Sequence, residues 1–126
     1  MNRREIRETI IKLIYQDIID GDFFEEDYPT EVVEIYKDVK AVYPEIDQII
    51  SDNLTSWSIT RLNYVDLAII RFAVYEMKYL KLASEIAINE ALEITKKYSN
   101  LDDDLARKFN NRLLDNIRIS LEKENG

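Results

Sequence analysis

The sequence contains no cysteine and no histidine. Without cysteine, the chain has neither a disulfide framework nor thiolate ligands for a metal ion. Without histidine, it lacks the most common general base and the most common zinc ligand. These two absences weigh against the enzyme and metal-site chemistries that depend on those side chains.

Glycine and proline are also scarce, with two residues of each among 126. This scarcity argues against a turn-rich β-sandwich or barrel. Hydrophobic residues make up 46% of the chain and can supply a core, while charged residues at 33% suit the solvated faces of helices. The length fits one domain, residues 1–126. We therefore predict an all-α protein, a compact bundle of six or seven helices.

Long apolar runs are missing as well. No stretch approaches the ~18 apolar residues of a membrane span, and the N-terminus lacks the apolar core of a signal peptide. We expect no membrane association and a cytoplasmic location.

Charge is unevenly distributed. The chain carries a net charge of -8, yet it opens MNRREIR, with Arg3, Arg4 and Arg7 in its first seven residues. Affinity for nucleic acid comes mostly from Lys and Arg neutralising phosphates, so an acidic protein must gather its cations locally or share the task with a basic partner. The cluster could equally be the solvated first turn of a helix, where the helix dipole disfavours cations by a few tenths of a kcal/mol, roughly.

Hydrophobic periodicity predicts a series of amphipathic helices. The first spans residues 2–19, with Asn2 as its cap and Glu5 completing a capping box, and Gly21 breaks it. The other helices are predicted at about residues 29–42, 46–56, 59–79, 85–98 and 104–121, with Ser58 and Ser84 as caps.

Residues 59–79 are the most apolar segment and predict a buried central helix. Arg71 lies within it, and a buried arginine needs a partner to offset its desolvation. Asp66, Glu76 and Asp115 are the candidate partners. An ion pair that fixes the order of the helices is the favoured interpretation over a ligand-binding role.

No catalytic constellation stands out. The run Asp102–Asp104 could hold a metal or move protons, but a solvated helix start is the favoured interpretation. Phe109 follows Arg107 and Lys108 and precedes Arg112 by one turn. An exposed aromatic among cations is a platform for single-stranded RNA, although core packing of Phe109 is favoured by composition.

Several strings resemble the NusB family of bacterial transcription antitermination factors: RREIRETIIKLIYQ, RLNYVDLAIIRFAVYEMKYL, AINEALEITKKYS and KFNNRLLDNI. The resemblance covers the first helix and residues from about 57 to 117. It implies an all-helical fold of two small packed helical subdomains and no enzymatic activity. It also implies binding to the boxA element of nascent ribosomal RNA leaders together with the ribosomal protein NusE, in a complex that joins other Nus factors on RNA polymerase.

The resemblance also implies functional residues. The RNA-binding set it implies is Arg3, Arg4, Arg7, Tyr15, Lys108 and Phe109. Asp66 falls on an acidic position near the RNA and NusE surface and is the predicted partner-binding residue.

The sequence departs from the family's Asp-Ser-x-Lys-Phe-Val-Asn-Gly pattern. It reads DDLARKFNNR, with one extra residue between the last Asp and Lys108 and with Arg112 in place of the glycine. Arg112 either adds a phosphate contact or crowds the site, and we include it in the predicted RNA-binding set. The alternative function is a helical protein-interaction module of the same fold that has weakened or lost RNA binding, with the acidic run 20–34 as its partner-facing surface. A homodimer that hides the RNA surface is also open.

Overall fold

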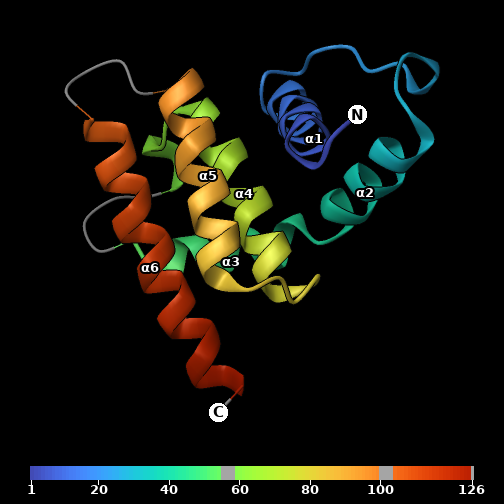
Figure 1. The fold of residues 1–126 in the computed structure, drawn as a ribbon. Helices are drawn as coiled ribbons and strands as arrows, with labels where there is room; N and C mark the ends of the chain where they lie inside the picture. The colour runs from blue at the N-terminus through green and yellow to red at the C-terminus, as the bar shows by residue number, and fades with distance from the viewer. Residues whose placement is uncertain (55–58, 100–103, 126) are drawn as a thin grey trace.

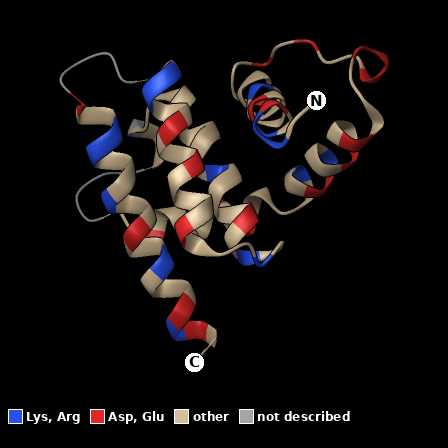
Figure 2. Ribbon diagram, viewed as in Figure 1, with Lys and Arg blue, Asp and Glu red and all other residues tan. Residues whose placement is uncertain are grey.

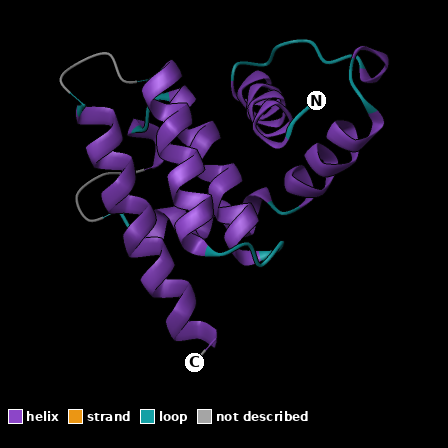
Figure 3. Cartoon of the chain, viewed as in Figure 1, coloured by secondary structure: helices purple, strands orange, loops and turns teal. Residues whose placement is uncertain are grey.

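The chain folds into six α-helices and two short 3₁₀ segments in a computed structural model that describes residues 1–54, 59–99 and 104–125 (Figure 1). The elements are α1 (Arg3–Ile18), η1 (Glu25–Asp27), α2 (Thr30–Ala41), α3 (Tyr43–Asp52), η2 (Ile59–Arg61), α4 (Tyr64–Lys78), α5 (Ser84–Tyr98) and α6 (Leu105–Asn125). All the regular structure in these ranges is helical (Figure 3), which confirms the predicted class. The described residues hold six α-helices, the lower of the two numbers predicted.

α4 is the centre of the fold, as its apolar sequence predicted. Eleven of the twelve residues from Asp66 to Met77 are buried, and the remaining one, Arg71, is half-buried. The helices α1, α3, α5 and α6 all pack against it. In Figure 1, α1 and α2 lie to one side of α4, and α5 and α6 lie to the other. One continuous hydrophobic core joins these parts, running from Ile10 in α1 to Leu121 in α6.

The ends of α1 follow local chemistry. Asn2 caps the helix: its Oδ1 accepts from the Glu5 backbone N–H at 2.9 Å, and its Nδ2 donates to the Glu5 carboxylate at 2.9 Å. This confirms the predicted cap. At the other end, Asp20 rather than Gly21 takes the left-handed conformation, with a φ of 54°. The helix therefore stops at Ile18, before the predicted glycine breaker.

Several other helix bounds differ from their predictions. α3 begins at Tyr43 and ends at Asp52, where a helix over 46–56 was predicted, and α4 begins at Tyr64 rather than at residue 59. Ser84 is the first residue of α5 rather than its cap, because Ala83 holds the cap position and offers no side-chain hydrogen bond. α6 continues to Asn125, beyond the predicted end at Leu121, and Glu122 in this extension accepts hydrogen bonds from Arg118 one turn earlier. The predicted cap Ser58 and the acidic residues Asp102 and Asp103 lie outside the described residues.

Arg71 forms an ion pair, but with a residue that the sequence analysis did not propose. Its Nε and Nη2 donate to the two carboxylate oxygens of Asp47 in α3, at 2.9 and 2.8 Å. Its guanidinium also lies 4.5 Å from the ring centre of Tyr43. Asp47 lies 24 residues before Arg71 in the sequence, and the two meet only because α3 packs against α4. Local sequence pattern therefore could not predict this pair. The pair joins α3 to α4, which confirms a structural role for Arg71.

Candidate nucleic-acid interface

The three arginines of the opening segment have different environments. Arg3 is exposed and has no polar partner among the described residues. The side chain of Arg4 is 48% exposed and pairs with Glu90 of α5 at 2.8 Å. The side chain of Arg7 is only 12% exposed and binds Glu76 of α4 through three hydrogen bonds of 2.9 to 3.1 Å. Arg3 is thus the arginine of this set that is most open to a ligand.

Burial and charge act together at Arg7 and Glu76. The hydrogen bonds that Arg7 donates to Glu76 raise the pKa of Arg7, and the charge of Glu90 reinforces this from 3.9 Å. Burial raises the pKa of the Glu76 carboxyl above its ordinary value, while Arg7 acts in the opposite direction. A desolvated carboxylate requires a partner of opposite charge, and Arg7 is that partner for Glu76. A ligand could bind the Arg7 guanidinium only by competing with this ion pair.

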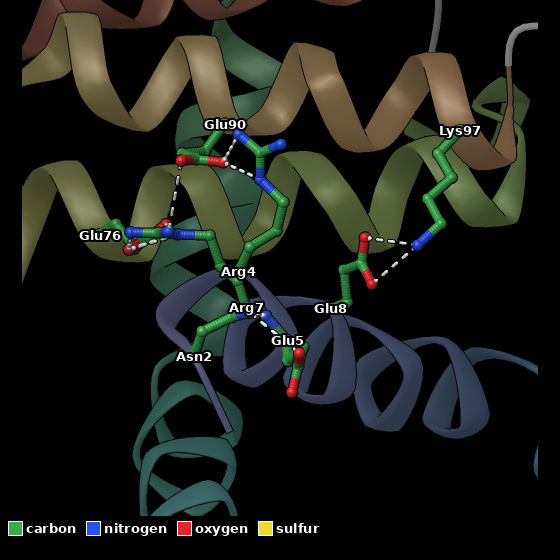
Figure 4. Close-up of polar contacts among 8 residues, drawn as sticks. All are labelled: Asn2, Arg4, Glu5, Arg7, Glu8, Glu76, Glu90 and Lys97. Atoms are coloured by element: carbon green, nitrogen blue, oxygen red, sulfur yellow. Dashed lines mark hydrogen bonds and ion pairs between the residues drawn. The ribbon is translucent and has the colours of Figure 1, made fainter.

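A third contact extends this row of ion pairs along α1. Glu8 accepts from Lys97 of α5 at 3.1 and 3.2 Å, and the Tyr98 hydroxyl donates to Glu8 at 3.4 Å. Figure 4 shows the side chains of α1 reaching across to α4 and α5 along this row. The row attaches α1 to the rest of the bundle, and it turns the charged face of α1 toward protein rather than solvent.

Asp66, the predicted partner-binding residue, lies inside the protein. It is 7% exposed, and its Oδ1 accepts from Ser99 Oγ at 2.6 Å and from Asn110 Nδ2 at 3.1 Å. Asn110 also donates to Thr95 Oγ1 at 3.1 Å. The network ties α4, α5 and α6 together at the end of the bundle where α6 begins. Asp66 is therefore hydrogen-bonded inside the bundle rather than presented on its surface.

The remaining predicted residues lie on α6. Lys108 and Arg112 are exposed, and Phe109 is partly buried against the hydrophobic core. Lys108 and Arg112 are one helical turn apart and so share a face of α6. α4 and α5 stand between α6 and α1 (Figure 1), so the predicted RNA-binding residues form two groups rather than one cluster.

Tyr15 also lies on α1, in the wall of a pocket of about 200 Å³ formed by α1, α4 and α5. Lys12 and Tyr98 line the same pocket, and Lys97 contacts the ring of Tyr98. These three residues were not among those predicted from the sequence. The adjacent string KKY at 96–98 was the available signal, since it places cations beside an aromatic at the end of a helix.

Basic residues gather at one end of the bundle. Figure 2 shows Lys and Arg at the end of α5 and in the first half of α6, whereas the acidic turn η1 lies on the other side of the molecule. Among the described residues, no group of three His, Cys, Asp or Glu side chains could hold a metal ion, and no helix is long and apolar enough to cross a membrane. These features describe a helical protein that carries local groups of cations on an acidic chain.

Comparison with known proteins identifies the family. The model of the NusB family matches residues 4–118, and the chain belongs to this family. Transcription antitermination protein NusB of Listeria innocua is 37% identical over 126 aligned residues, covering 93% of this chain and 96% of that protein. The corresponding protein of Ligilactobacillus salivarius is 42% identical over 107 aligned residues, covering 82% and 77%. The family comprises transcription antitermination factors rather than enzymes.

Solved structures agree with this assignment. A crystal structure of NusB from T. maritima superimposes with a TM-score of 0.77 at 31% identity, covering 93% of this chain and 90% of that one. A chain from a structure described as a plectonemic RNA supercoil also gives a TM-score of 0.77, at 28% identity and with 94% of both chains covered. The all-helical NusB fold implied by the sequence is therefore confirmed.

Proposed function

We propose that this chain binds the boxA element of ribosomal RNA leader transcripts together with the ribosomal protein NusE. The complex then joins other Nus factors on RNA polymerase in the cytoplasm and suppresses termination. Residues 1–126 act as one RNA-binding domain. The proposal rests on membership of the NusB family.

The distribution of unpaired cations supports RNA binding by an acidic chain. Arg3, Lys12, Lys108 and Arg112 are exposed, and none of them has a carboxylate partner among the described residues. Each is therefore available to neutralise a phosphate. A net charge of -8 opposes nonspecific attraction, so a basic partner such as NusE should strengthen the complex.

The ion pairs of α1 change how much each arginine is expected to contribute to RNA binding. Arg4 and Arg7 already neutralise Glu90 and Glu76, so an RNA phosphate must compete with a resident carboxylate for them. We therefore assign the main electrostatic contribution of α1 to Arg3. Arg7 contributes by fixing the position of the helix.

The test is a titration of boxA RNA with and without NusE at two salt concentrations. Four phosphate contacts to a single strand give a slope of log K on log salt near −3, a loss of roughly fiftyfold between about 50 and 200 mM salt. Binding to boxA in the presence of NusE that is no tighter than binding to a scrambled RNA would overturn the proposal. Light scattering on the free protein tests whether a homodimer competes with RNA.

One observation favours the alternative function, a protein-interaction module without RNA binding. Two of the three opening arginines already pair with carboxylates of this chain, while Phe24, 55% exposed, lies within the acidic run 20–34. On this alternative, NusE binding survives the joint substitution of Arg3, Arg4 and Arg7, and no RNA enters the complex.

A further inference from the structure

Glu90 of α5 lies opposite the N-terminal arginines of α1. Its Oε2 accepts a hydrogen bond from Arg4 Nε at 2.8 Å and lies 2.8 Å from Arg4 Nη2. Its Oε1 lies 3.9 Å from Nη1 of Arg7. Figure 4 shows both arginines reaching from α1 toward this carboxylate. A single acidic side chain on α5 therefore faces two cations of α1.

Arg7 has a partner of its own and does not depend on Glu90. It donates three hydrogen bonds to Glu76, and both of these side chains are largely buried. Arg4 is different, because Glu90 is the carboxylate that it contacts. The Arg4 side chain is 48% exposed and that of Glu90 is 19% exposed, so the guanidinium lies on the solvent side of the pair.

The charges of these four side chains cancel. Arg4 and Arg7 contribute two positive charges, and Glu76 and Glu90 contribute two negative ones. A phosphate that reaches Arg4 from solvent is attracted by the guanidinium and repelled by the carboxylate directly behind it. The two groups lie well within a Debye length of about 8 Å, so salt does not screen this repulsion from the attraction.

We propose that Glu90 competes with RNA phosphates for Arg4 and thereby lowers the affinity of the free protein for RNA. The inference rests on the proposed function and adds to it a residue that sets the affinity. Binding to nucleic acid is driven by cations that release counterions when they meet phosphates. An arginine that a carboxylate already neutralises has little to release. The pair between Arg4 and Glu90 therefore makes tight binding depend more strongly on a partner.

Charge distinguishes this role from the opposite one, in which Glu90 would orient Arg4 for a phosphate. An orienting carboxylate improves the aim of the guanidinium but cancels its charge. In a chain with a net charge of -8, positive charge is scarcer than orientation. Oε2 also occupies the Nε and Nη2 edge of the guanidinium, one of the edges that can offer two donors to a phosphate.

The test compares the parent protein with Glu90→Gln in titrations of boxA RNA, with and without NusE, at two salt concentrations. Glutamine keeps the size of the side chain and removes its charge. Arg4 then adds one phosphate contact, so the slope of log K on log salt should steepen by about 0.7 and the affinity at about 0.1 M salt should rise by up to about fivefold. Thermal melting should show a folded variant, because Arg7 keeps its pair with Glu76.

Two further variants assign the gain to Arg4. Glu122→Gln makes the same change in net charge near the C-terminal end of α6, where Glu122 is 61% exposed and pairs with Arg118. It should leave RNA affinity unchanged. Arg4→Gln, introduced into the Glu90→Gln chain, should remove most of the gain, since the freed guanidinium is then absent.

The outcomes separate the role of Glu90 from the proposed function. If Glu90→Gln weakens RNA binding or leaves it unchanged while the variant remains folded, Glu90 does not compete for Arg4. If Glu122→Gln gives an equal gain, the effect comes from net charge and the assignment is again wrong. In both cases RNA binding itself stands. If the parent protein does not distinguish boxA from a scrambled RNA, the proposed function fails, and the role of Glu90 fails with it.

Discussion

Replacing Arg7 with methionine should destabilise the protein far more than its position in an N-terminal basic cluster suggests. The substitution keeps the apolar stem of the side chain but removes the guanidinium from Glu76. That carboxylate is on a side chain only 7% exposed, so it is left desolvated and unpaired. Breaking a buried pair from one side costs about 3–5 kcal/mol.

The lower end of that range applies here, because Arg7 retains 12% exposure and water can reach the edge of the site. A loss of about 3 kcal/mol corresponds to a fall in Tm of about 10 °C for a chain of this size. Arg4→Met is the matched control on the same helix. Arg4 is 48% exposed, so the loss of its pair with Glu90 should cost no more than about 1 kcal/mol.

The loss should also depend on pH. Without Arg7, burial and Glu90 both raise the pKa of Glu76 above its ordinary value of 4.5. A carboxyl with a raised pKa in the folded state supports stability below its ordinary pKa and reduces stability as the pH rises through the folded value. The Arg7→Met variant should therefore lose more stability at about pH 7 than at about pH 5.

Urea unfolding of the parent, Arg7→Met, Glu76→Gln and the double variant at both pH values measures the coupling between the two side chains. A loss below about 1 kcal/mol that is equal at the two pH values would refute the reasoning. Such a result is typical of a solvent-screened surface pair.

Three further predictions concern other parts of the fold. Burial and the hydrogen bond to Asp17 raise the pKa of the Tyr43 phenol, so the free energy of unfolding should fall above about pH 10 by up to about 1.4 kcal/mol per pH unit. Tyr43→Phe should reduce this slope in urea titrations, and equal slopes for the variant and the parent protein would contradict the assignment. Lys81 has a φ of 56°, which is strained for lysine and unstrained for glycine, so Lys81→Gly should raise stability by about 0.5–1 kcal/mol in thermal melts. A lower Tm would show that the contacts of the Lys81 side chain stabilise the fold by more than the strain costs. Asn110→Ala should cost about 2 kcal/mol in urea unfolding by removing a donor from the buried Asp66, and a neutral result would show that this hydrogen bond adds nothing.

The sequence predicted those parts of the structure that depend on local pattern. The near-continuous apolar character of residues 59–79 predicted the burial of α4, and the spacing of Asn2 and Glu5 predicted the start of α1. Both features arise from residues within one or two helical turns of each other. Gly21 was a misleading signal, because the neighbouring Asp20 takes the left-handed conformation.

The pairing of charges could not be predicted in the same way. Arg71 pairs with Asp47, and Arg7 pairs with Glu76, 69 residues away, because the packing of helices brings these side chains together. For the same reason, the sequence offered Arg3, Arg4 and Arg7 as equals, whereas their contacts distinguish them. The pocket at Tyr15 could not be foreseen either, since three helices must pack before it exists.

The central position of α4 has a consequence for the order in which the chain opens. Its backbone is covered by α1, α3, α5 and α6, so its amide protons can exchange with solvent only when most of the bundle separates. η1 has no buried residue and should exchange through small local openings. The slowest exchange should therefore be found in α4, at a free energy equal to that of complete unfolding.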